Sequence, residues 1–123
     1  FFQRAKELGD RLLPGLAGYG HGIPFSDINV RTGRGAFLGG DASSAEATTL
    51  GMEFRTLSAL TGNPKYAAAV DRISETFHKA EKQNGLIKIR IDPHSGKFDG
   101  NTISLGSRGD SYYEYLLKEW LLF

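Results

Sequence analysis

Two glutamates in the middle of the chain lie on an unexpected face of a predicted helix. The helix is expected over residues 43–60, and at 100° per residue Glu46 and Glu53 fall within about 20° of each other, inside a leucine-rich stripe. Arg55 falls on the opposite side. A carboxylate on a buried face is costly unless it is paired, hydrogen-bonded or next to a wet cleft. A structural salt bridge, a position at the edge of the core and a binding site all stay open as interpretations.

A second group of polar residues comes just before a strongly apolar helix near the end of the chain. Arg108 and Asp110 are flanked there by Gly106 and Gly109, which keep the backbone uncrowded. Backbone N–H groups at a helix start stabilise a nearby carboxylate, and an arginine can bridge a carboxylate or fork onto sugar hydroxyls. Taken by themselves, the residues favour a plainer interpretation, in which Asp110 only extends the cap and Arg108 is a surface charge.

Charge and cysteine content exclude several other classes of function. Lys and Arg total 15 and Asp and Glu total 14, so the net charge of +1 gives no electrostatic reason to expect nucleic acid or an anionic membrane. The chain has no cysteine, which excludes a disulfide or a cysteine metal site within it. No apolar run is long enough to span a bilayer. The three histidines stand apart, without the spacing of metal ligands.

The elements that must position these residues are four helices and one β-hairpin. The helices are expected over residues 2–13, 43–60, 63–84 and from about 111 onward, and the hairpin over 86–104. Ser43 or Ser44 can cap the second helix and Asn63 the third. Residues 15–42 are glycine-rich and are expected to form an irregular loop. The buried stripe of the third helix is predicted to consist of Tyr66, Val70, Ile73 and Phe77.

The last predicted helix is apolar or aromatic nearly all round. Ser111 and Glu114 match a capping box at its start, and Glu114 and Lys118 form a favourable i,i+4 pair. The tyrosines and Trp120 of this helix could stack on a sugar, although such residues are more often core. Its composition suits an inner helix of a larger assembly, so we expect residues 1–123 to be one part of a larger domain.

The order of several motifs resembles that of the class I α-1,2-mannosidases, glycoside hydrolase family 47. The matching motifs include Gly22-Ile23-Pro24-Phe25, Ala45-Glu46-Ala47-Thr48-Thr49, Leu60-Thr61-Gly62 and Ser107-Arg108-Gly109-Asp110-Ser111-Tyr112-Tyr113-Glu114-Tyr115. The resemblance covers the whole chain, and the string from Asp110 to Lys118 is its most specific part. One departure is the loop 34–41, which is glycine-rich where members of the family often carry Trp or Pro.

The resemblance implies a mainly α fold, a consecutive arc of an (α/α) seven-fold barrel with a short β-hairpin between the third and fourth helices. Residues 1–123 would then be a partial catalytic domain. The implied activity is hydrolysis of terminal α-1,2-linked mannose from high-mannose N-linked glycans on glycoproteins, with inversion and a bound calcium ion (Ca2+) whose ligands lie outside these residues. The implied location is the secretory pathway, in the endoplasmic reticulum or Golgi, and the full-length protein could carry a membrane anchor.

The same resemblance assigns roles to three residues. Asp110 matches an acidic residue of the catalytic set, which acts as an acid directly or through water. Glu46 matches a carboxylate that contacts sugar hydroxyls, and Arg108 matches a position that is arginine in enzymes of the endoplasmic-reticulum type. Glu53 is expected to be structural only.

The residues that would complete the reaction are expected elsewhere. An inverting glycosidase needs an acid and a base on opposite faces of the sugar. The family's acid candidate is expected before this stretch, and its base and calcium-binding threonine after it, so residues 1–123 alone are expected to be inactive. A mannosidase-like lectin that directs misfolded glycoproteins to degradation is the alternative, and the arginine at position 108 favours the enzyme.

Overall fold

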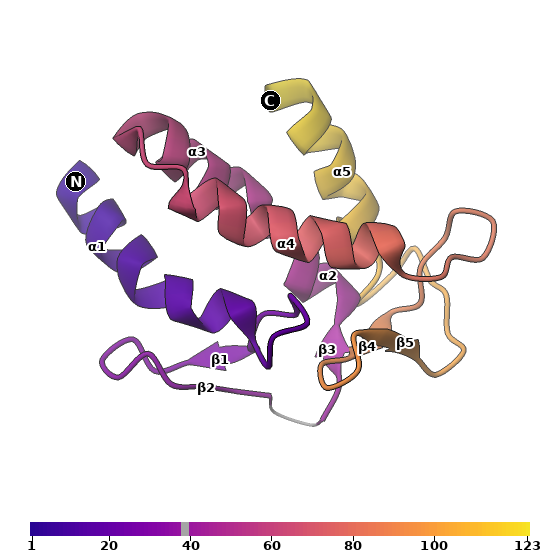
Figure 1. Ribbon diagram of the computed structural model, residues 1–123. Helices are drawn as coiled ribbons and strands as arrows, with labels where there is room; N and C mark the ends of the chain where they lie inside the picture. The colour runs from indigo at the N-terminus through magenta and orange to yellow at the C-terminus, as the bar shows by residue number, and fades with distance from the viewer. Residues whose placement is uncertain (38–39) are drawn as a thin grey trace.

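The computed structural model describes residues 1–37 and 40–123 and is mainly helical (Figure 1). Leu38 and Gly39, which belong to the glycine-rich loop that departs from the family pattern, lie outside the described residues. The α-helices are α1 (Phe2–Leu12), α2 (Ser44–Thr48), α3 (Gly51–Thr61), α4 (Lys65–Lys79) and α5 (Asp110–Leu122), and the 3-10 turn η1 (Leu13–Ala17) follows α1.

Short antiparallel strands lie at one end of the helices (Figure 1). β4 (Arg90–Asp92) and β5 (Lys97–Asp99) form the predicted hairpin, and β3 (Ala42–Ser43) adds to the free edge of β4. β1 (Asp27–Ile28) pairs with β2 (Gly35–Ala36), so the loop expected over 15–42 contains more regular structure than predicted. The expected fold class, a mainly helical arc of an (α/α) barrel with a hairpin before the last helix, is confirmed.

The core forms around α4, as the sequence predicts. All four side chains of its expected stripe are buried: Tyr66, Val70, Ile73 and Phe77. Ile23 of the glycine-rich loop and Ile87 and Ile91 of the hairpin region are also fully buried and join the same cluster. Helix α4 therefore packs against both the other helices and the hairpin region.

The prediction of a single helix over residues 43–60 is wrong. The chain leaves helical geometry at Thr49 (φ −99°, ψ 40°), so α2 and α3 are separate helices. The hydroxyl of the preceding Thr48 donates to main-chain carbonyls of the previous turn, and Gly51 follows with low helix propensity. The helical rotation of 100° per residue, which placed Glu46 and Glu53 on one face, therefore cannot be counted across Thr49. Glu46 and Glu53 are accordingly exposed instead of buried.

Several predicted helix ends are also displaced. α5 begins at Asp110 with Gly109 as its N-cap, so Ser111 lies inside the helix and the predicted capping box does not form. The Glu114–Lys118 pair is present. α4 ends at Lys79, five residues before the expected stop, because Ala80 is extended (ψ 145°). The Lys82 ammonium group donates to three main-chain carbonyls at this end.

The start of α4 differs in detail from the prediction, and α1 contacts α3 through a glycine. Pro64 is the N-cap of α4, and the Asn63 side chain still accepts a hydrogen bond from the Lys65 N–H at 3.1 Å. On α1 the buried position is Gly9, whereas Leu8 is half exposed. Gly9 is the contact because any side chain there would overlap Leu57 of α3.

Candidate functional site

The first turn of α2, which carries Glu46, is hydrogen-bonded to the turn that carries Arg108. The Ser43 hydroxyl accepts from the Glu46 N–H at 3.4 Å, which identifies Ser43 as the cap of this helix. The Ala45 N–H donates to the Arg108 carbonyl at 2.9 Å. This main-chain hydrogen bond joins two segments that are far apart in sequence, the one that carries Glu46 and the one that carries Arg108. We call this Ala45–Arg108 hydrogen bond the α2–α5 joint.

Ser44 attaches the same turn to the hairpin region. Its N–H donates to the Ile89 carbonyl at 3.0 Å, and its hydroxyl donates to the Lys88 carbonyl at 2.7 Å. Ser44 is completely buried, so these bonds are sheltered from competing water. The free N–H groups of the first turn of α2 are therefore satisfied by the strand side and by the start of α5, which fixes where α2 begins.

The turn before α5 is held in an unusual backbone conformation. Arg108 has φ 71°, which is rare for a residue other than glycine, and Gly109 is buried. A Cβ on Gly109 would overlap the Ser104 carbonyl oxygen. The N–H groups of Gly109 and Asp110 both donate to the Gly106 carbonyl, at 3.1 and 3.0 Å. This turn presents the Arg108 carbonyl to α2 and places Asp110 in the first position of α5.

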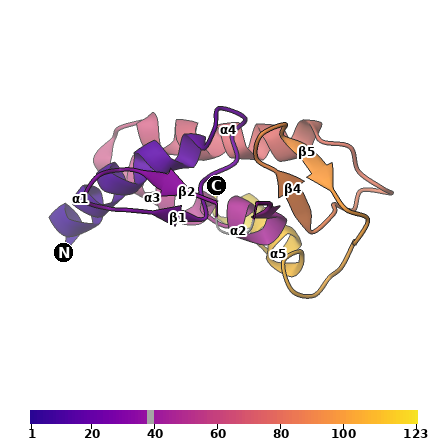
Figure 2. The ribbon, with the colours of Figure 1, turned by 90° about the horizontal axis from the view of Figure 1, so that it is seen from below.

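The side chains of Glu46, Arg108 and Asp110 are all exposed. Among the described residues no ion pair joins any two of them, and the Asp110 carboxylate accepts only from the neighbouring Ser111. α2 and α5 lie side by side in both views (Figures 1 and 2). The geometry thus offers two carboxylates on adjoining helices and a guanidinium in the turn before α5, all accessible to a polar ligand and not paired with each other.

Glu46 also lines a small hollow of about 150 Å³. Phe25 and Pro24 from the loop before β1 form part of its wall, together with Leu50 at the break between α2 and α3. An apolar ring beside a carboxylate suits a sugar, which has both carbon and hydroxyl faces. Phe25 was not among the predicted site residues, although its motif had been noted, because nothing in the spacing places it beside Glu46.

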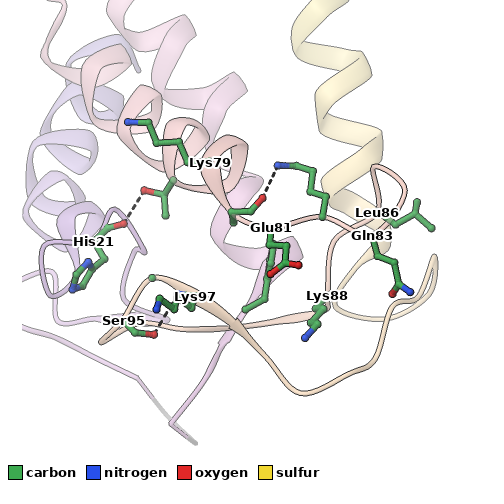
Figure 3. A pocket seen from close by; sticks show the side chains of 13 residues that line it. His21, Lys79, Glu81, Gln83, Leu86, Lys88, Ser95 and Lys97 are labelled. Atoms are coloured by element: carbon green, nitrogen blue, oxygen red, sulfur yellow. Dashed lines mark hydrogen bonds between the residues drawn. The ribbon is translucent and has the colours of Figure 1, made fainter.

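A larger hollow, of about 810 Å³, lies between the end of α4 and the β4–β5 hairpin (Figure 3). Lysines, a histidine and Glu81 line it, and none of the three candidate residues does. Two of its lysines are already engaged, Lys79 with Glu75 and Lys82 with the carbonyls that end α4. Size alone therefore does not make this hollow the candidate site.

The described residues contain no group of three or more His, Asp or Glu side chains that could hold a metal ion. The described residues do not provide a calcium site by themselves. Within 1–37 and 40–123, no helix has both the length and the apolar composition needed to cross a membrane.

Comparison with known proteins decides the family. A family model described as glycosyl hydrolase family 47 matches residues 1–123. The chain belongs to this family. Family 47 relatives of this chain include the endoplasmic reticulum mannosyl-oligosaccharide 1,2-alpha-mannosidase of Saccharomyces cerevisiae, which is 44% identical over 129 residues, covering 99% of this chain and 24% of the relative. The human protein of the same name is 40% identical, covering 98% of this chain and 18% of its own length.

A solved structure gives the same result for the fold. The chain matches the alpha-1,2-mannosidase from Trichoderma reesei with a TM-score of 0.84 and 26% identity, over 98% of this chain and 25% of that one. The family 47 chain described here thus spans about a quarter or less of the length of the proteins that it matches. The architecture of this quarter is shared with a mannosidase.

The predicted site residues lie on neighbouring segments of the structure. The α2–α5 joint links Arg108 to Ala45, the chain neighbour of Glu46, and Asp110 follows two residues further along. The structure does not support a salt-bridge role for Glu46 or Glu53, because neither carboxylate has an ion-pair partner among the described residues. The joint was not foreseeable, because no local pattern reveals a main-chain contact between distant turns.

Proposed function

We propose that the full-length protein hydrolyses terminal α-1,2-linked mannose from high-mannose N-linked glycans. The observation that carries the proposal is family 47 membership over the whole chain, with relatives named mannosyl-oligosaccharide 1,2-alpha-mannosidase at 40% identity or more. The exposed cluster at the α2–α5 joint supports it, since carboxylates and a guanidinium are the groups that hydrogen-bond sugar hydroxyls. Residues 1–123 are proposed to be part of the catalytic domain.

Each residue of the cluster has a distinct proposed role. Asp110 acts in the catalytic set, as an acid directly or through water. Glu46 accepts hydrogen bonds from mannose hydroxyls next to the Phe25 ring. Arg108 offers several N–H donors in a fixed fork and selects the branch mannose that is removed. An inverting reaction also needs a base on the other face of the sugar, which lies outside these residues in this proposal.

Inversion, calcium dependence and cellular location belong to the same proposal. The calcium ligands are proposed to lie in other parts of the full-length protein. The names of the yeast and human relatives support a location in the endoplasmic reticulum. Any membrane anchor is likewise assigned outside residues 1–123.

The test is mannose release from a high-mannose N-glycan by the purified full-length protein. Wild type is expected to release mannose, and Asp110→Asn is expected to lose at least 100-fold of that rate, on the order of the contribution of a positioned acid. Asp27→Asn, at an exposed site on β1, serves as the matched control and should keep the wild-type rate. Normal release by Asp110→Asn would remove Asp110 from the catalytic set, and an unchanged choice of mannose in Arg108→Leu would remove the specificity role.

The same experiment separates the enzyme from the lectin alternative. A lectin would retain the glycan on the protein without cleaving it. If wild type binds the high-mannose glycan and releases no mannose, with calcium supplied, the enzymatic proposal is wrong and the lectin assignment replaces it.

A further inference from the structure

The candidate residues lie on two elements that meet at the α2–α5 joint. Glu46 is on α2, and Asp110 begins α5. The start of α5 is held by the hydrogen bond of this joint and by two side chains of its first turn: the Tyr112 ring is buried in the core, and the Tyr113 hydroxyl accepts from the Ile87 N–H at 3.0 Å. All three contacts lie at or just before the first turn of α5 and do not restrain its far end. A second attachment is therefore needed further along α5 if Asp110 is to keep a fixed orientation toward Glu46.

Glu119 provides that second attachment. It lies about 13 Å along the axis from Asp110, at 1.5 Å per residue. The Arg55 Nε of α3 donates to Glu119 Oε2 at 3.3 Å, and the same guanidinium contacts Asp71 Oδ1 of α4 at 2.6 Å. The side chains of Arg55 and Glu119 are only 21% and 19% exposed. This ion-pair group therefore ties α3, α4 and α5 together between the helices.

The start of α3 is shaped to receive the Glu119 carboxylate. Gly51 is the first residue of α3, and a Cβ there would overlap the Glu119 carboxylate oxygens. Leu50, the N-cap, offers no side chain to the free N–H groups of this turn. Those N–H groups and the helix dipole favour a negative charge at this end. Glu119 thus meets both Arg55 and the positive end of α3.

We infer that Glu119 and Arg55 are positioning residues for the candidate site. The inference rests on the proposed function for its catalytic consequence. The joint fixes the start of α5 and Glu119 fixes a point more than two turns later, and two points define the axis of a helix. Loss of the second point lets α5 pivot about the joint. Displacement of a catalytic group by about 1 Å can cost on the order of 100-fold in rate.

An ordinary surface ion pair would not have this effect. The pair between Glu75 and Lys79 on α4 is 60% and 70% exposed and lies within one helix. Exposed pairs of this kind contribute little to stability and fix no angle between elements. Glu75→Gln is therefore the matched control, because it removes a glutamate charge from an ion pair without touching a contact between helices.

The experiment uses the full-length protein and two readouts. We expect Glu119→Met to lower kcat for mannose release about tenfold with KM within about twofold, since a partial loss of orientation acts on the reacting geometry. Arg55→Met should match it, and the double variant should be no worse than either single one, because the two residues share one interaction. Glu119→Gln should retain most of kcat, since its carbonyl still accepts from Arg55.

The second readout does not depend on activity. Hydrogen exchange at the Ala45 amide, which donates to Arg108, should become faster in Glu119→Met and stay unchanged in Glu75→Gln. Faster exchange at Ala45, while the amides of α4 keep their protection, supports a pivot; faster exchange throughout would indicate a purely structural role and overturn the inference. Unchanged exchange at Ala45 in Glu119→Met also overturns it, whether or not kcat falls. A wild-type protein without mannose release would contradict the proposed function alone, because the exchange result still decides the positioning role.

Discussion

Helices α4 and α5 are both rich in apolar residues, yet their apolar side chains differ in burial within the described residues. α4 buries its whole predicted stripe within this chain. α5 buries Tyr112, while five of its last seven residues in the helix are between 53% and 77% exposed: Leu116, Leu117, Trp120, Leu121 and Leu122. α4 is held mainly by apolar packing, whereas α5 packs its first turn into the core through Tyr112 and is attached further along by the polar contact of Glu119 with Arg55. The difference separates a helix that builds the core from a helix whose placement serves the candidate site.

The contrast between α4 and α5 predicts its largest effect on stability at a buried residue of α4. Phe77 is 1% exposed and contacts the rings of Phe98 and Tyr112. Phe77→Ala in the full-length protein should lower the free energy of unfolding by about 3–5 kcal/mol, because it removes buried apolar surface and leaves a cavity. Denaturant unfolding measures this loss. Ser74→Ala on the exposed face of the same helix should stay within about 0.5 kcal/mol of wild type.

A change at the start of α5 should instead affect activity more than stability. Gly109→Ala would push a methyl group into the Ser104 carbonyl and shift the turn that carries Asp110. Overpacking of this kind costs about 1–3 kcal/mol. We expect a fall in mannose release larger than the lost fraction of folded protein explains. Gly106→Ala in the same turn makes a tight contact only with the Ser104 Oγ, at 3.2 Å, which is a side-chain atom that can shift, and the variant should keep both properties. Equal behaviour of the two variants would remove the role of this turn.

The smallest expected effect is a pH dependence at the attachment of α1 to α4. Hydrogen bonds from Lys6, then Lys65 and Tyr66, hold the pKa of Asp10 well below its usual range. A lowered native pKa contributes stability above the unfolded value of about 3.9, and that contribution is lost as the pH falls below it. Wild type should therefore lose more stability than Asp10→Asn between about pH 4 and pH 2.

Chemical denaturation at several pH values measures this difference. Tyr66→Phe removes one of the three donors to Asp10 and should give an intermediate slope. Parallel curves for wild type and Asp10→Asn would show that Asp10 has the same pKa in the folded and unfolded chain.

Local chemistry made much of the fold predictable. The stripe of α4 follows from helical periodicity alone, since each of its members points to the same side. The turn between β4 and β5 follows from Asp92, whose side chain accepts from the His94 N–H at 2.9 Å, and from Gly96, which takes a positive φ of 68°. These contacts involve neighbours in sequence, so residue types are enough to indicate them.

The site was less predictable because its determinants are contacts between distant segments. The helical rotation that placed Arg55 outside and Glu46 inside fails at Thr49, directly after Thr48, whose hydroxyl donates to carbonyls of the preceding turn. The joint between Ala45 and Arg108 depends on the left-handed φ of Arg108, which no propensity indicates for arginine. Residue-level reasoning thus favoured a plain role for Arg108, and only the family resemblance singled it out.

The most direct test of the account is a crystal structure of the full-length Asp110→Asn protein with α-1,2-linked mannobiose. The account predicts a mannose hydroxyl within hydrogen-bonding distance of the Glu46 carboxylate, about 2.7–3.2 Å, with the glycosidic oxygen facing residue 110. The Ala45–Arg108 hydrogen bond should be intact in that complex. A disaccharide bound away from both α2 and the start of α5, for example in the lysine-lined hollow beside the β4–β5 hairpin, would contradict the account.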